Sequence, residues 1–240
     1  MRQNHPERSR SYRLWLLGVV LLLTIPACGG NRAPDSSKIP PPPAIKTVVV
    51  MGFNAPLPPG EKPDLVRNTV TGTTFMSYPV TGEVVGWLTE RLFDMLAAQR
   101  RWGLIPPGQA RGAMENFLAS DAGTGSTPLK LIQDVGKTFR ADAVLTGQVY
   151  RWRERVGSDF GVESPASVAF DLSLIRSSDG AILWRGNYDK TQQSLMENIF
   201  DFKTYMKGKG LWLRARGLAQ LGLDKMLAEM PGSPPVKEDS

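Results

Sequence analysis

The sequence predicts an α/β domain, in which a mixed sheet of about four to five strands is packed by helices in a two-layer or three-layer sandwich. Three observations predict this class. Strand-like runs alternate with helix-spaced apolar residues in the first half, three strand-like segments follow one another in the second half, and a further helical segment closes the chain. We expect this domain to occupy residues 46–230.

The first predicted strand is Lys46–Phe53, a β-branched run that is too short for a helix and apolar on both sides. This pattern is typical of a central strand that is buried on two faces. The segment Asn54–Tyr78 follows and is rich in Pro, Thr and Gly. It predicts a long irregular loop, and loops of this length are usually functional or mobile.

The first predicted helix spans Thr81–Arg100, with Thr81 as its N-cap and Glu83 in its first turn. Apolar residues recur along it at helical spacing, which indicates one buried face. These residues are Val84, Leu88, Leu92, Met95 and Leu96.

Two more helices are predicted before the strand-rich half. A short strand at Trp102–Ile105 precedes the helix Gly108–Ala119. The third helix begins at Thr127-Pro128, where a capping residue stands before an N1 proline, and it runs through Phe139. The second helix repeats the apolar spacing that indicates a buried face, through Ala110, Ala113, Met114, Phe117 and Leu118.

Three strands are predicted next, at Ala143–Arg153, Ser167–Arg176 and Ala181–Gln192. The dipeptide Asp179-Gly180 is a strong hairpin signal between the last two strands. In the middle strand the apolar side chains face one way, whereas Asp171 and Ser173 face the other. One side of the sheet is therefore expected to be core, and the other side wet or helix-covered.

The chain is predicted to end in a helix at about Leu211–Met230, with an apolar face and a Lys225–Glu229 pair on the other face. We expect the tail 231–240 to be disordered.

The amino-terminal segment indicates where the protein resides. Four arginines precede an apolar run, Leu14–Ile25, whose length fits the core of an export signal and falls well short of the ~20 residues of a membrane span. The end of this run resembles the lipobox of bacterial lipoproteins, in which the signal 1–27 is removed and Cys28 is lipidated. The alternatives are a secretory signal with an incidental cysteine, or a signal anchor.

Residues 28–45 predict a tether, because they are rich in Pro, Ser and Gly and include four consecutive prolines, Pro40–Pro43. Its sixteen residues 29–44, if extended at ~3.1 Å per residue, reach up to ~50 Å. The residue after the lipidated cysteine is Gly29, which in the lipobox resemblance implies sorting to the periplasmic face of the outer membrane. The membrane, reached through Cys28, is therefore the first expected partner.

The composition narrows the chemistry of the mature chain. His5 is the one histidine and leaves with the signal, and Cys28 is the one cysteine. Ser-His-Asp triads, Cys-His dyads and ordinary zinc sites are excluded on this ground, and we expect no enzyme activity, no cofactor and no metal site. Net charge falls from +6 to +3 when the signal is removed, without a basic stripe, so we expect no nucleic-acid partner.

Four carboxylates in the domain are candidates for acid/base chemistry. Asp142 fits a turn before a strand, Asp179 fits a hairpin turn, and neither they nor Asp171 and Asp189 show the paired spacing that such catalysis uses. We therefore assign no catalytic residue.

Three alternating arginines are the candidate partner-binding residues. Arg151, Arg153 and Arg155 point to one face of a strand, with Trp152 on the other face. Such a ridge can meet an acidic partner or anionic lipid headgroups. The alternative is a solvated face, because exposed charge is the default and also protects strand edges.

The order and spacing of these segments resemble a family of envelope proteins. The segments that carry the resemblance are VVVMGF (48–53), AAQRRWGLIPPGQARGAMENFL (97–118), ADAVLTGQV (141–149) and VAFDLSLIRSSDGAILW (168–184). The family contains the curli-secretion lipoprotein CsgG, the penicillin-binding-protein activator lipoproteins (LpoB) and the amino-terminal domain of TolB. The resemblance implies a small α/β sandwich that binds other envelope components or assembles into a ring, and that is not an enzyme.

One departure from this family concerns pore formation. Pore subunits of the CsgG kind insert long alternating hairpins, whereas the connection Arg153–Ser167 is short and charged. We therefore expect a lipid-anchored binding or assembly module for another envelope protein or a peptidoglycan-associated complex. The alternatives are an oligomeric secretion subunit, which would make the chain its own partner, and a carboxylate-only hydrolase acting on peptidoglycan.

Overall fold

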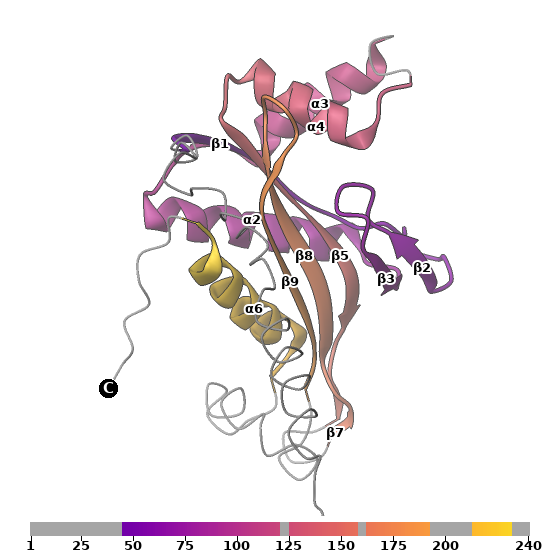
Figure 1. The fold of residues 1–240 in the computed structure, drawn as a ribbon. Helices are drawn as coiled ribbons and strands as arrows, with labels where there is room; N and C mark the ends of the chain where they lie inside the picture. Colours follow the sequence, from indigo (N-terminus) through magenta and orange to yellow (C-terminus); the bar gives the residue numbers. More distant parts are fainter. Residues whose placement is uncertain (1–44, 121–124, 158–161, 193–212, 232–240) are drawn as a thin grey trace, which may run out of the picture. The chain divides into compact units, whose positions relative to one another are not determined.

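The structure is a computed structural model and describes residues 45–120, 125–157, 162–192 and 213–231 (Figure 1). The expectations for the signal peptide, Cys28, the tether and the tail lie outside these residues. Within them, five strands form one sheet in the order β4-β1-β5-β8-β9. Their bounds are β1 Thr47–Asn54, β4 Gly103–Ile105, β5 Ala143–Arg153, β8 Ser167–Arg176 and β9 Ile182–Thr191.

The sheet is mixed, as the sequence predicts. β1 lies parallel to both β4 and β5, and β8 lies antiparallel to both β5 and β9. Val48, Val49 and Val50 of β1 are fully buried, which confirms the expected central strand. The turn from β8 to β9 is closed by two hydrogen bonds: the Arg176 N–H donates to the Ala181 carbonyl, and the Gly180 N–H donates to the Arg176 carbonyl. Gly180 has φ +76°, and the predicted hairpin is confirmed.

The prediction of an irregular loop at Asn54–Tyr78 is wrong in part, because this segment contains a two-stranded antiparallel sheet. Its strands are β2 (Asp64–Arg67) and β3 (Thr74–Ser77), and the pair projects beside β5 (Figure 1). The prolines lie before β2, so they do not interrupt the ladder. A second small pair, β6 (Val156–Gly157) and β7 (Val162–Ser164), lies in the connection from β5 to β8.

Four helices pack on the five-stranded sheet in the described residues: α2 (Gly82–Gln99), α3 (Pro107–Ala119), α4 (Pro128–Thr138) and α6 (Ala215–Glu229). Thr127 caps α4 as predicted, since its hydroxyl accepts the Lys130 N–H at 3.2 Å. Thr81 stands at the N-cap of α2, but its side chain makes no cap hydrogen bond. α6 begins at Ala215 instead of Leu211, because Leu213 and Arg214 precede it without helical structure.

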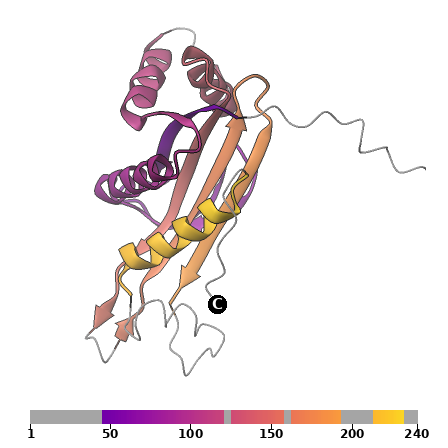
Figure 2. The same ribbon diagram turned by 90° about the vertical axis from the view of Figure 1, so that its left-hand side faces the viewer.

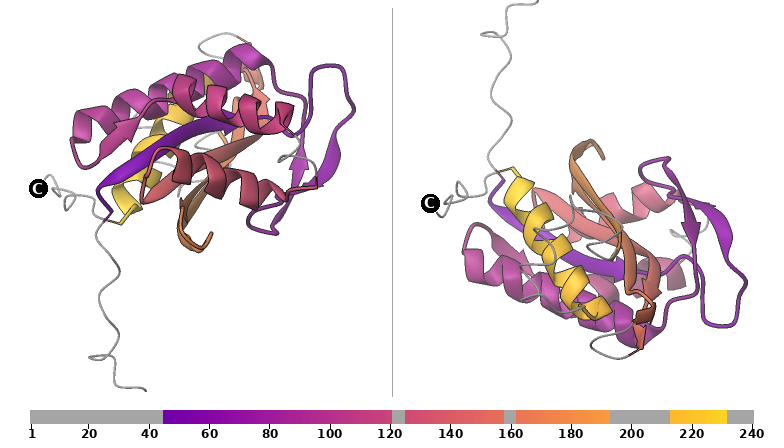
Figure 3. Two further views of the ribbon diagram at one scale, coloured as in Figure 1. Left: turned by 90° about the horizontal axis from the view of Figure 1, so that it is seen from above. Right: turned by 90° about the horizontal axis from the view of Figure 1, so that it is seen from below.

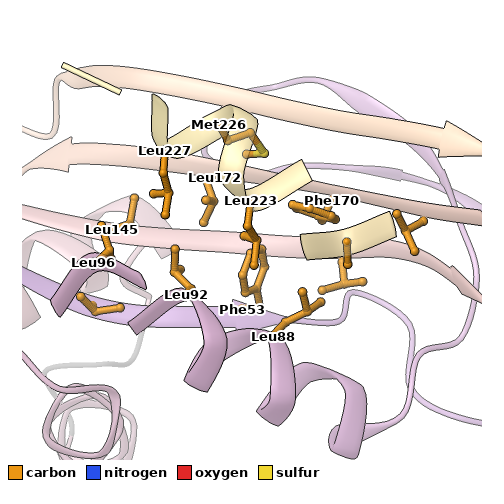
Figure 4. Close-up of a cluster of buried hydrophobic side chains, with 14 of the residues drawn as sticks. Phe53, Leu88, Leu92, Leu96, Leu145, Phe170, Leu172, Leu223, Met226 and Leu227 are labelled. Carbon is orange, nitrogen blue, oxygen red and sulfur yellow. The ribbon is translucent and has the colours of Figure 1, made fainter. Parts of the chain in front are cut away.

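The larger core lies between the sheet and the helices α2 and α6. Figure 4 shows side chains from α2 and α6 meeting those of the strands, and Figure 2 shows α6 crossing the sheet. Trp87, Trp102 and Trp184 are partly buried and pack against this core. The labelled members are Phe53, Leu88, Leu92, Leu96, Leu145, Phe170, Leu172, Leu223, Met226 and Leu227.

The smaller core lies on the opposite face, where α3 and α4 pack together at one end of the long strands (Figure 3). Val49, Val144 and Ile175 supply its strand side. Leu118 was predicted on the buried face of α3, but its side chain is 62% exposed. This prediction is wrong because the helix spacing that places Ala110 and Phe117 toward the sheet turns Leu118 outward.

The two cores make the domain a three-layer sandwich, with helices on both faces of one sheet. None of the helices in the described ranges combines the length and the apolar character that crossing a membrane requires.

Candidate functional site

The second face of the sheet changes from apolar to polar along its strands. On β8 the buried Ile175 under α4 is followed on the same face by Ser173 and then Asp171. On β5, Thr146 and Gln148 stand opposite them in the ladder. The predicted alternation of Asp171 and Ser173 is confirmed, yet both are buried, at 5% and 3% exposure.

Asp171 is held by three hydrogen-bond donors, two from β5 and one from the turn between β2 and β3. Its Oδ2 accepts the Tyr150 hydroxyl at 2.7 Å and the Asn68 side-chain amide at 2.8 Å. Its Oδ1 accepts the backbone N–H of Gln148 at 3.0 Å. The Asn68 amide also donates to the Tyr150 hydroxyl at 2.9 Å, which closes a three-residue network. A buried carboxylate of this kind is fixed in position.

Asn68 also shapes the turn between β2 and β3. Its Oδ1 accepts the N–H groups of Val70 and Thr71 at 2.8 Å and 3.0 Å, the Asx-turn geometry that asparagine favours. Gly72 follows at φ +74°, a conformation that glycine adopts without steric cost. One side chain therefore both builds the hairpin turn and fastens it to Asp171.

The hairpin is also held by an aromatic contact. Phe75 of β3 stacks on Tyr150 with ring centroids 4.0 Å apart and an interplanar angle of 18°. Tyr78, just after β3, donates its backbone N–H to the Tyr150 carbonyl at 2.7 Å. Tyr150 thus joins the hairpin to the sheet through its ring, its hydroxyl and its backbone.

Burial dominates the electrostatics of this network. It raises the pKa of Asp171 above the ordinary value of an aspartate, although the hydrogen bonds from Tyr150, the Gln148 backbone and Asn68 act in the opposite direction. Burial also raises the pKa of Tyr150, and the neighbouring Asp171 carboxylate raises it further. Tyr150 therefore stays protonated and serves as a donor.

A pocket of ≈ 200 Å³ opens beside this network, between the Asn68 turn and the helices α3 and α4. One wall is apolar and the floor is polar. The apolar side chains are Met51, Val70, Met114, Leu118, Pro128, Leu131 and Ile132, and the polar ones are Asn54, Asn68, Thr69, Thr146, Gln148, Asp171 and Ser173.

A second pocket, of ≈ 220 Å³, adjoins the first along the sheet and shares Asp171 and Ser173 with it. It is lined by Thr71 and Thr73 of the turn and by Arg185 and Asn187 of β9. Because residues of the turn line both pockets and Asn68 bonds to Asp171, the hairpin reaches over the polar floor where the two pockets meet.

The predicted arginine ridge is only partly exposed. Arg151 donates to the Ser167 hydroxyl at 2.7 Å and forms an ion pair with Asp189, and its side chain is 16% exposed. Arg153 ends β5 and is exposed, whereas Arg155 lies beyond the strand. Trp152 packs on the opposite core, as expected from the alternation. Partner binding by Arg151, Arg153 and Arg155 stays a prediction.

The remaining carboxylates have structural roles. Asp142 accepts the backbone N–H groups of Lys46 and Thr47 at 2.8 Å and 2.9 Å, and these bonds lower its pKa. Asp179 accepts the Ala181 N–H at 3.0 Å in the β8–β9 turn, and this bond lowers the pKa of Asp179. The structure thus gathers neither of them, nor Asp189, into the pocket with Asp171.

Sequence reasoning missed Asn68, Tyr150 and Gln148 as members of this site. The signal that pointed toward it was Asp171, a carboxylate inside an otherwise apolar strand. A buried carboxylate needs hydrogen-bond donors, so Asp171 indicates that donors from other parts of the chain lie close to it.

No family model matches the chain, and no curated protein matches it. Similar solved structures include the LpoB C-terminal domain from Salmonella enterica, with 17% identity and a TM-score of 0.37 over 62% of this chain and 84% of that one. Lipoprotein GNA1162 from Neisseria meningitidis has 13% identity and a TM-score of 0.40 over 68% and 92%. The PelC dodecamer from Paraburkholderia phytofirmans has 16% identity and a TM-score of 0.41 over 76% and 84%.

LpoB, one of the three proteins named in the expected resemblance, is therefore among the solved structures that match. The resemblance to CsgG and TolB stays a prediction. Matches at these identities and TM-scores establish neither a family nor a function for this chain.

Proposed function

We propose that this chain is a lipid-anchored binding module of the bacterial cell envelope, held through Cys28 at the periplasmic face of the outer membrane. The observation that carries the proposal is the apolar run that ends at Cys28 and is followed directly by the proline-rich tether. A diacylated cysteine exceeds the single-chain limit for reversible membrane binding. The tether then separates the lipid from the folded domain.

The pocket at Asp171 favours binding over catalysis as the role of the domain. Glycoside hydrolysis by carboxylates uses a pair that flanks the reacting bond. Among the described residues that line the pocket, Asp171 is the single carboxylate, and it is engaged by three donors. Such a group positions a ligand or a loop more readily than it transfers protons.

The anchor is tested by expressing the full chain and its Cys28→Ser variant in a diderm bacterium with a labelled fatty acid. The wild type is expected to incorporate label and to fractionate with the outer membrane. The variant is expected to lose both properties. Equal labelling of the two proteins, or a wild type found only in the soluble periplasm, would contradict the proposal.

The binding role is tested by crosslinking the anchored protein in cells and identifying what co-purifies. Another envelope protein or a peptidoglycan-associated complex is expected, and the recovery of the chain alone would contradict the adaptor role.

A native mass measurement in detergent examines the alternative of a homo-oligomeric secretion subunit. A discrete ring of many copies would replace the adaptor by that alternative, and glycan cleavage that is lost in Asp171→Asn would overturn the non-enzyme proposal.

A further inference from the structure

The floor of the Asp171 pocket offers acceptors that the protein itself leaves unused. The side-chain oxygen of Gln148 is buried and has no hydrogen-bond partner in the described part of the chain. Buried polar atoms without a partner are uncommon in folded proteins, and each one asks for an explanation. Asp171 accepts three hydrogen bonds, whereas a carboxylate has about four acceptor positions. A ligand that carries N–H groups would use both residues.

Asp171 has no cationic partner among the described residues that line the pocket. The three donors to Asp171 are a hydroxyl, a side-chain amide and a backbone N–H, all of them neutral. No lysine or arginine is among the described residues that line the pocket. Arg185 lines the adjoining pocket, and no ion pair joins it to Asp171 in the described ranges. A cationic ligand would therefore meet an acceptor of opposite charge.

The rest of the pocket fits a short apolar chain. Met114 and Leu118 of α3 and Leu131 and Ile132 of α4 form a wall opposite the polar floor. The volume of ≈ 200 Å³ is smaller than the ~300–1,000 Å³ of pockets that hold drug-sized molecules or cofactors. An occupant the size of one side chain is therefore expected. A lysine side chain combines an apolar stem with three N–H donors on a cationic head.

We propose that this pocket binds an alkylammonium group of the lysine type, with the ammonium on Gln148 and Asp171 and the alkyl stem along α3 and α4. The inference rests on the proposed binding role and deepens it by naming the chemistry that is recognised. Burial raises the pKa of the Asp171 carboxyl, and a bound cation would favour its charged form.

The first experiment titrates the full mature chain in detergent with Nα-acetyl-lysine amide, followed by calorimetry or NMR. The matched probe is Nα-acetyl-norleucine amide, which keeps the stem and lacks the ammonium. The lysine probe is expected to bind at least roughly tenfold more tightly. Equal affinities, or no saturable binding of the lysine probe at millimolar concentration, would overturn the inference.

The second experiment changes the polar floor of the pocket. Gln148→Met removes the unpartnered oxygen and is expected to weaken lysine-probe binding by about tenfold at an unchanged melting temperature. Gln109→Met is the matched control, because Gln109 is exposed on α3 and lies outside this pocket. Asp171→Asn is expected to abolish the preference for lysine over norleucine. If Asp171→Asn fails to fold, Gln148→Met alone tests the inference. An affinity of Gln148→Met for the lysine probe equal to that of the wild type would overturn it.

The source of the ammonium is distinguished by repeating the crosslinking pull-down with Gln148→Met. Loss of the co-purified protein would support a lysine of that partner, and its retention together with weakened probe binding would support a free amine. If the lysine probe fails to bind while Cys28 is labelled and a partner is captured, the inference is overturned and the proposed function stands.

Discussion

The two faces of the sheet differ in what covers them. The first face lies under α2 and α6 along much of its length, and its strand side chains form one apolar core. The second face lies under α3 and α4 at one end, while the hairpin β2–β3 and a pocket with a polar floor occupy the next part of it. The same strands serve both faces, because successive side chains alternate between them.

β8 contributes neighbouring side chains to both faces of the sheet. Leu172 is fully buried in the first core, and the adjacent Asp171 is buried on the second face among hydrogen-bond donors. Apolar burial in the larger core stabilises the fold, and this stabilisation offsets the cost of burying a carboxylate on the opposite face. The proposed binding site therefore lies on the face of the sheet opposite the larger core.

The largest loss of stability is expected from shortening a buried side chain on the first face. Leu92→Ala removes a fully buried side chain of α2 and is expected to lower the free energy of unfolding by ~2–5 kcal/mol. Leu118→Ala makes the same change at an exposed position beside the pocket and is expected to cost less than ~0.5 kcal/mol. Urea unfolding measures both values, and equal costs would remove the distinction between the faces.

A second test adds volume where α6 crosses the sheet. A Cβ at Gly222 would lie 2.5 Å from Tyr188 Cδ1 and 2.8 Å from Phe170 Cζ, so Gly222→Ala is expected to cost ~1–3 kcal/mol. At Gly86 of α2 a Cβ meets no atom within 4 Å. Gly86→Ala is expected to stabilise the protein by up to ~1 kcal/mol, as alanine does in helices. Melting temperatures that change in the same direction in both variants would contradict the expected clash at Gly222.

The polar face is tested by the pH dependence of stability. The pKa of Asp171 is raised in the folded state above the ordinary aspartate value of 3.8, because the side chain is buried, so the folded protein holds this proton more tightly than the unfolded chain. Its favourable contribution is fully present below pH 3.8 and is lost as pH rises through the folded-state pKa.

The comparison variant is Asp171→Asn, which cannot titrate at this position. The free energy of unfolding of the wild type minus that of the variant is expected to fall as pH rises through this window. Urea titrations at a series of pH values measure the difference. A difference that is constant or rises with pH would show that burial does not dominate the environment of Asp171.

The smallest effect is expected on the arginine ridge. Arg151→Gln removes the ion pair with Asp189 and is expected to cost ~0–1 kcal/mol, the range for pairs that are partly open to water. Arg153→Gln, at an exposed strand end, is expected to change stability by less than ~0.5 kcal/mol. A larger loss for Arg153 than for Arg151 in chemical unfolding would contradict the contacts that the structure assigns to the ridge.

The sheet was largely predictable from the sequence because its residues follow a short period. The bounds of β5 and β8 coincide with the segments expected from their β-branched and aromatic residues. The helix α2 lies within its expected span for the same kind of reason, an apolar repeat with the helical period. The local sequence pattern was sufficient to predict a strand or helix wherever one face of that element packs against a core.

The hairpin β2–β3 was not predictable in this way. Each strand has four residues, with two adjacent apolar residues in its middle, so the sequence shows no alternation of apolar and polar residues. Leu65 and Met76 are 63% and 47% exposed. The hairpin is held instead by Asn68 and by the contact of Phe75 with Tyr150.

The pocket network depends on distant residues for the same reason. Asn68 and Asp171 are 103 positions apart, and no sequence period connects two residues that meet only after the sheet has formed. The alternation in β8 could place a carboxylate on the second face, but it could not name the partners of that carboxylate.

The position of β1 has a mechanical consequence. The chain enters the domain at Lys46 and Thr47, whose N–H groups are fastened to Asp142, and continues into a strand bonded to β4 on one edge and β5 on the other. A pull on the residues before β1 acts along this strand and loads both hydrogen-bonded edges in shear at the same time. Tension on the chain before Lys46 would therefore be borne first by β1 together with its two neighbours, β4 and β5.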